Sequence, residues 1–118
     1  MEEARATWQH YVNVALPAAA QRKDAAQKHW PVALNHCFGR IIFDHVLGSK
    51  AQKPWKDVIA NPKQPAIKQL TLDQFHACNQ LAQAILDGDA DLNALDEQSL
   101  RFRQKPIKTA AKRSMHVS

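Results

Sequence analysis

Stretches with apolar residues at helical spacing alternate along the chain with short polar stretches that contain proline. Apolar side chains recur three and four positions apart in "FHACNQLAQAIL", residues 75–86, and a similar spacing occupies residues 8–16. Val, Ile, Thr and aromatic residues nowhere alternate with polar ones over the length of a strand. The pattern therefore predicts an all-α protein, a compact bundle of four to six short helices in one domain of about residues 1–104.

Prolines and capping residues indicate where these helices begin and end. The expected helices span residues 3–16, 17–28, 31–47, 72–87 and 92–102. Pro17 ends or kinks the first of them, and the alanine-rich second one is mostly polar, which indicates a peripheral position. Thr71 and Gln74 fit a capping box, and Gly88 suits the end of the helix that follows. Short helical turns are expected in "PWKDVIAN" and "PAIKQL".

The most apolar segment, "HWPVALNHCFGRIIFDHVLG" at residues 29–48, is expected to supply the central helix, over about residues 31–47. Pro31 suits the first helical turn and Gly48 suits a left-handed C-terminal cap. One broad side of this helix gathers Leu34, Phe38, Ile41, Ile42 and His45. Further apolar side chains lie around the rest of its circumference, so other helices, or a second copy in a homodimer, are expected to cover it.

A polar strip on the same helix is the first candidate site. His36, Arg40 and Asp44 stand one helical turn apart, and Cys37 adjoins them. In one interpretation Arg40 and Asp44 form a surface ion pair of about 0.2–0.5 kcal/mol and His36 is solvated. In the other, the strip is the floor of a groove. There Asp44 orients Arg40, whose guanidinium binds a small ligand with a carboxylate or a phosphate.

The spacing of the His and Cys residues gives less support to a metal site or to a nucleophilic cysteine. His45 lies among apolar residues, which is typical of a core histidine bonded to a backbone carbonyl or a buried hydroxyl. No CxxC, HxxxH or HExxH spacing occurs, so no metal site is expected. Cys37 and Cys78 are expected to be reduced, buried thiols. Arg40 could lower the pKa of Cys37, but a position within a helix lacks the N-terminal dipole that commonly activates thiols.

The excess of positive charge lies at the C-terminal end. Residues 1–100 hold ten Lys and Arg against eleven Asp and Glu, a net charge of −1, whereas residues 101–118 hold six basic residues and no acid, a net charge of +6. We expect a flexible tail, disordered from residue 105, that attracts nucleic acid or an acidic protein. The residues expected to make these contacts are Arg101, Phe102, Arg103, Lys105, Lys108, Lys112 and Arg113.

Several functional classes find no motif in the chain. A Gly-rich phosphate loop, GxSxG and paired catalytic carboxylates are absent, so no cofactor is expected. The helix over residues 72–87 contains no Lys or Arg and cannot read a major groove in the usual way. No secretory signal and no apolar run of roughly 20 residues is present, so a cytoplasmic protein without a membrane span is expected. Trp8, Trp30 and Trp55 suit core packing, or a groove on which a base stacks.

Two functional hypotheses remain open. The first is a small helical binding module that combines an anion-accepting groove on the central helix with a basic tail. The alternative is a small helical enzyme or small-molecule-binding protein in which Arg40 clamps an anion and His36 or Cys37 is the reactive group. Helical bundles accommodate both, so the fold alone does not separate them.

Overall fold

Residues 1–103 are described by the computed structural model, and the regular structure they form is helical throughout. The α-helices are α1 (Glu2–His10), α2 (Leu16–Arg22), α3 (Asn35–Gly48), α4 (Leu72–Asp87) and α5 (Leu92–Phe102). A π-helical segment, η1 (Tyr11–Ala15), joins α1 to α2 in one continuous helix, called the N-terminal rod below. Two 3-10 turns, η2 (Trp55–Asp57) and η3 (Ala66–Lys68), follow α3. The prediction of an all-α fold is confirmed for this part of the chain.

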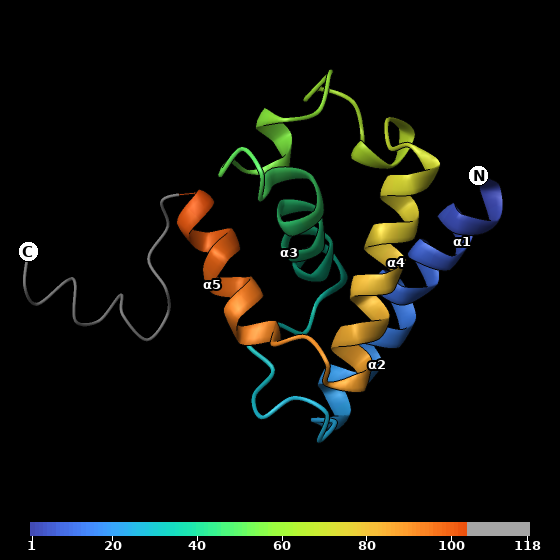
Figure 1. Ribbon diagram of the computed structural model, residues 1–118. Coiled ribbons are helices and arrows are strands. Elements are labelled where there is room, and N and C mark those ends of the chain that lie inside the picture. The colour runs from blue at the N-terminus through green and yellow to red at the C-terminus, as the bar shows by residue number, and fades with distance from the viewer. Residues whose placement is uncertain (104–118) are drawn as a thin grey trace, which may run out of the picture.

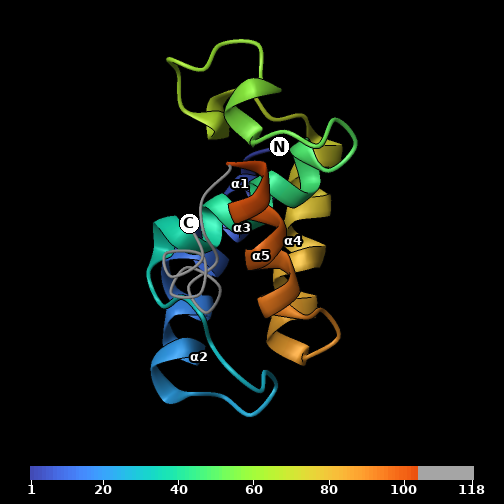
Figure 2. The same cartoon turned by 90° about the vertical axis from the view of Figure 1, so that its left-hand side faces the viewer.

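The helices are arranged around α3, which lies between α5 and α4 in Figure 1. The N-terminal rod packs against both α4 and α3. Figure 2 shows the segment between α3 and α4 at one end of the molecule and the loop between α2 and α3 at the other. Phe38, Ile41 and Ile42 of α3 are wholly buried and share one core with Phe75 and Ile85 of α4. Leu92 and Leu95 of α5 belong to the same core, which therefore reaches helices on different sides of α3.

The N-terminal rod continues through Pro17, where the sequence predicts an end or a kink. Pro17 has no N–H for the carbonyl four residues before it, and its ring would crowd that carbonyl in a regular α-helix. The wider turns of η1 come just before this point, with the Leu16 N–H bonded to the Tyr11 carbonyl. The rod ends at Lys23, which has a left-handed φ of 54°, so the predicted helix to residue 28 is too long. Within the helix predicted over residues 17–28, Ala19 and Ala20 are buried, so this segment packs one face against the rest of the protein and is not wholly peripheral.

Helix α3 begins four residues later than Pro31 suggests. Leu34 is the extended N-cap residue of the helix, and its side chain is 59% exposed rather than part of the core. At the other end, Gly48 is the last helical residue, and Ser49 after it keeps right-handed φ and ψ. The predicted left-handed cap at Gly48 is therefore wrong.

Helices α4 and α5 occupy the residues predicted for them. The Thr71 hydroxyl accepts a hydrogen bond from the Gln74 N–H at 3.1 Å, and the Gln74 side chain accepts one from the Thr71 N–H at 2.8 Å. Gly88 ends α4 with a φ of +80°. The Asp91 carboxylate accepts hydrogen bonds from two backbone N–H groups at the start of α5. Local capping chemistry thus sets the bounds of these helices.

The two cysteines are free thiols with different surroundings, which predicts different reactivity. Burial raises the pKa of Cys78 to about 12 from a usual value of 9.0, whereas Cys37 is half-buried. We expect an alkylating reagent at pH 8 to modify Cys37 first. Cys78 should react roughly a thousandfold more slowly, because the reagent reaches it only when the protein unfolds. Peptide mass spectrometry over time measures both rates.

Equal labelling of the two thiols in the native protein would contradict the buried position of Cys78. The pH dependence has a defined sign. The unfolded chain releases the Cys78 proton near pH 9, whereas the folded chain keeps it up to about pH 12. This thiol therefore lowers stability progressively as the pH rises above about 9.

Candidate functional site

A cleft of about 360 Å³ opens between the N-terminal rod, α3, η2 and the end of α5. Its volume falls within the range of about 300–1,000 Å³ that is typical of ligand sites. We call it the aromatic cleft, and its lining consists of Trp8, Val12, Asn13, Asn35, His36, Gly39, Arg40, Phe43, Trp55, Lys56 and Arg103. Segments far apart in the sequence therefore contribute to one surface.

Three aromatic rings form the apolar wall of the aromatic cleft. The ring centroids of Trp8 and Phe43 lie 4.9 Å apart with their planes at 33°, and Phe43 meets Trp55 edge-on at 5.6 Å. Trp8 and Phe43 are buried, whereas Trp55 is half-buried. Such ring contacts contribute about 0.5–1.5 kcal/mol beyond the area they bury, so the three rings hold one another in place. Of the three, Trp55 has the most surface left for a ligand.

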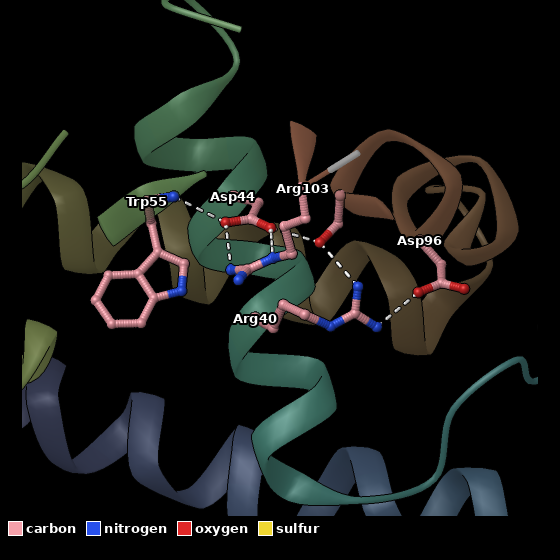
Figure 3. Close-up of polar contacts among 6 residues, drawn as sticks. Arg40, Asp44, Trp55, Asp96 and Arg103 are labelled. Carbon is pink, nitrogen blue, oxygen red and sulfur yellow. Dashed lines mark hydrogen bonds and ion pairs between the residues drawn. The ribbon is translucent and has the colours of Figure 1, made fainter. Parts of the chain in front are cut away.

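Asp44 anchors the charged wall from inside the protein. Its wholly buried carboxylate accepts hydrogen bonds from the Trp55 backbone N–H at 2.8 Å and from the Ser99 hydroxyl. Arg103 binds the same carboxylate through Nε at 2.9 Å and Nη2 at 3.0 Å, a bidentate ion pair (Figure 3). Each carboxylate oxygen therefore accepts two hydrogen bonds, as a buried charge requires. Asp44 thus joins α3 to η2 and to the end of α5.

Arg40 is held by α5 rather than by its own helix. Its Nη1 donates to the Ser99 hydroxyl at 2.9 Å, and its Nη2 donates to Asp96 at 2.8 Å. Ser99 accepts from Arg40 and donates to Asp44, so it connects two ion pairs in one network (Figure 3). The predicted ion pair between Arg40 and Asp44 is wrong in both interpretations, because α5 packs against this strip and supplies other partners.

Within residues 1–103, every charged side chain in the lining of the aromatic cleft is basic. Arg40 and Arg103 are neutralised from behind by Asp96 and Asp44, and neither acid belongs to the lining. Each guanidinium has five N–H groups, of which the network uses two. Lys56 is exposed beside them, with its ammonium 5.7 Å from the centre of the Trp55 ring. The cleft therefore has N–H donors and positive charge to offer to an anion.

The π-helical segment η1 contributes to the opposite side of the aromatic cleft. Val12 and Asn13 come from η1, and the Asn13 side-chain oxygen accepts a hydrogen bond from Asn35 at 3.1 Å. This bond ties the rod to the first turn of α3. Single π-helical turns occur frequently at functional sites, where they change which side chains face a ligand.

The remaining residues of the predicted polar strip lie in unlike surroundings. His36 is exposed at the rim of the aromatic cleft, whereas Cys37 is half-buried and lies outside its lining. Asp44 is wholly buried behind the lining, where Arg103, Ser99 and the Trp55 N–H occupy its carboxylate. His45 is half-buried and bonds the Gln98 side-chain oxygen at 2.8 Å, not the predicted carbonyl or hydroxyl. That His36, Cys37, Arg40 and Asp44 bind a ligand stays a prediction.

The predicted basic tail is described only at its beginning. Arg101 is exposed, Phe102 is half-buried, and Arg103 is part of the Asp44 network and of the cleft lining. The other predicted tail residues lie outside the described residues: Lys105, Lys108, Lys112 and Arg113. Of the three described side chains, Arg103 lines the aromatic cleft.

Sequence reasoning did not identify Asp96, Ser99 or Lys56 as part of the site. Asp96 and Ser99 stand three positions apart on α5 and share a face, but this spacing is common on helices. Their partners lie 55–59 residues away in the sequence, at Arg40 and Asp44. A local pattern carries no sign of such a distant partner.

Two further properties concern residues 1–103 only. No group of three His, Cys, Asp or Glu side chains stands close enough to hold a metal ion. None of the helices combines the length and the apolar composition needed to cross a membrane. The lining of the aromatic cleft offers cations, an imidazole, amide groups and aromatic rings.

Comparisons of the chain with protein-family models, with curated proteins and with solved structures find no significant match. Function is therefore inferred from the side chains of the aromatic cleft and from the network behind them.

Proposed function

We propose that the protein is a small helical binding module whose aromatic cleft accepts an anionic group carried on an apolar or aromatic body. The observation that supports this proposal most directly is the pairing of an aromatic wall with a lining whose charged side chains are all basic. Arginine guanidinium groups suit carboxylate and phosphate because they donate parallel hydrogen bonds. In this proposal the basic tail adds attraction for a polyanion or an acidic partner.

The buried network supports the proposal through preorganisation. Asp44 and Asp96 hold Arg103 and Arg40 in fixed positions before any ligand arrives. Binding to donors that are already fixed costs less conformational entropy than binding that must first order flexible side chains. Only Lys56, which is exposed and has no ion-pair partner among the described residues, has to be ordered.

The two thiols are poorly placed to act as nucleophiles in the aromatic cleft. Cys37 lies outside the lining of the aromatic cleft, and burial raises the pKa of Cys78, which keeps its thiol neutral. The free state of both cysteines suits the reducing cytoplasm that we propose as the location. The position of Cys37 argues against it as the reactive group of an enzyme, and in the alternative hypothesis it leaves that role to His36, which lines the cleft.

The binding proposal predicts that Lys56→Gln weakens the binding of an aromatic phosphate to the cleft. The probe is 1-naphthyl phosphate, with 1-naphthol and inorganic phosphate as the separated halves. We expect the intact probe to raise the melting temperature of the protein more than either half does. Lys56→Gln should lower the affinity for 1-naphthyl phosphate about two- to fivefold, the effect of one exposed ion pair. Thermal shift and isothermal titration calorimetry measure both results.

Lys53→Gln is the matched control, because Lys53 is also exposed but lies outside the aromatic cleft. It removes the same charge and should leave the affinity for 1-naphthyl phosphate unchanged. Equal protection by 1-naphthol, or equal effects of the two variants, would contradict the proposed anion site.

A further inference from the structure

We infer that the aromatic cleft binds single-stranded nucleic acid, with one base stacked on Trp55 and the adjacent phosphate bound by Lys56 and Arg103. This inference rests on the proposed function and names the ligand class for the same site. Nucleotides combine the two groups that the cleft accommodates, a flat aromatic ring and an anion a few ångströms from it.

Trp55 has the position that base stacking requires. Its inner edge packs against Phe43, with ring centroids 5.6 Å apart, and its backbone N–H is bonded to Asp44. The ring is therefore held on one side, while part of its surface stays accessible to solvent. Aromatic side chains fixed in this way serve as platforms in proteins that bind single strands, because every base has a face that stacks.

Two cations of the cleft lining accompany this platform. Lys56 follows Trp55 in the chain and keeps its ammonium 5.7 Å from the ring centre. Arg103 lines the same cleft and spends only two N–H groups on Asp44. A phosphate next to a stacked base would therefore meet a mobile ammonium and a fixed guanidinium.

The sequence that follows Arg103 favours a strand over a free nucleotide. Residues 101–118 contain six basic residues and no acid, and this stretch of the chain begins at the edge of the aromatic cleft. A strand anchored by one base carries further phosphates that such charges attract, whereas a mononucleotide carries none. Each phosphate neutralised by Lys or Arg releases counterions and adds affinity that falls with salt.

A duplex is a poorer fit for the same surface. The bases of a duplex are stacked inside and cannot reach Trp55 without being flipped out, which costs a few kcal/mol. Reading a major groove calls for a helix with Lys or Arg toward the bases, and α4 contains neither. Single strands present their bases without this cost.

Fluorescence anisotropy with the full chain tests the inference. The probes are a labelled 12-nucleotide DNA strand of mixed sequence, a 12-residue abasic strand of the same charge, and a 12-base-pair duplex. We expect the normal strand to bind at least about fivefold more tightly than the abasic strand, the gain from one stacked base. Equal affinities for the two strands would overturn the inference and leave attraction by charge alone.

Two variants locate the binding on the aromatic cleft. Trp55→Leu should reduce affinity for the normal strand about 5- to 100-fold and leave the abasic strand unchanged. Lys56→Gln should lower the affinity for the normal strand more than Lys53→Gln does, although each variant removes one charge. If Trp55→Leu fails to fold, the Lys56 and Lys53 pair still decides, and equal losses for that pair overturn the inference.

The result also separates this inference from the proposed function. If 1-naphthyl phosphate binds in a Lys56-dependent way but the normal and abasic strands bind alike, the anion site stands and the nucleic-acid inference fails. If AMP competes with the normal strand and binds as tightly as it does, the ligand is a free nucleotide and the strand inference is overturned. If neither 1-naphthyl phosphate nor the strand depends on Lys56, both proposals fail.

Discussion

Asp44→Ala is expected to lower the free energy of unfolding by about 3–5 kcal/mol, the usual cost of breaking a buried ion pair from one side. The substitution removes the acceptor of four hydrogen bonds at once. The Arg103 side chain, only 20% exposed, then has no carboxylate, and the buried Ser99 hydroxyl loses its acceptor. A domain of this size is stabilised by about 5–15 kcal/mol, so the loss would be a large share of the total. Urea unfolding followed by circular dichroism measures it.

The control is an ion pair on the surface. Asp24 pairs with Arg22 at 3.4 Å, with both side chains well exposed, and Asp24→Asn should cost less than about 1 kcal/mol. A double-mutant cycle adds a second test. Asp44→Asn combined with Arg103→Gln should cost less than the sum of the two single variants, because the second substitution removes the charge that the first leaves unpaired. Similar losses for Asp44→Ala and Asp24→Asn would contradict the network.

Helices with local boundary signals could be predicted from the sequence to the residue. The capping box at Thr71 and Gln74 and the left-handed Gly88 act within one turn of the helix they bound. The start of α3 could not be predicted in this way. Pro31 is compatible with a first helical turn, but residues 31–34 are not helical and Leu34 is extended. A residue that tolerates a helix start does not require one.

The candidate site could be predicted in its residues but not in its contacts. Helical geometry places His36, Arg40 and Asp44 on one strip of α3, yet their exposure falls along it, from an exposed His36 to a wholly buried Asp44. A helical wheel shows which side chains share a face. It does not show that α5 covers one end of that face, nor that an acid and a hydroxyl from α5 replace the expected neighbours.

Tertiary contacts also explain why η2 matters to the site. The segment after α3 returns to the helix through the hydrogen bond from the Trp55 N–H to Asp44. The same segment carries Lys56 to the aromatic cleft. The chain must therefore turn sharply between Gly48 and Trp55, and Gln52 adopts a left-handed φ of 56° within that turn.

Gly48→Ala is expected to lower the free energy of unfolding by about 1–3 kcal/mol, the usual cost of overpacking a tight site. A Cβ atom at Gly48 would stand 1.9 Å from the Lys53 carbonyl oxygen, and no contact of this kind exists in real proteins. The oxygen belongs to the backbone and cannot rotate away, so the turn itself must move. The Lys53 N–H is bonded to the Gly48 carbonyl at 3.2 Å, so this hydrogen bond would be strained as well.

Gly39→Ala is the matched control, because Gly39 lies in the same helix and its added Cβ would meet only Val12 Cγ2, at an ordinary 3.8 Å. Alanine is the better helix former by about 1 kcal/mol, so Gly39→Ala should leave stability unchanged or raise it slightly. Urea unfolding of the two variants gives the comparison, and Gly48→Ala should also shift the fluorescence of Trp55, which follows the displaced turn. A Gly48→Ala protein as stable as Gly39→Ala would mean that the chain does not return to α3 at Lys53. That result would also contradict the position of Trp55 in the wall of the aromatic cleft, because this turn places Trp55 there.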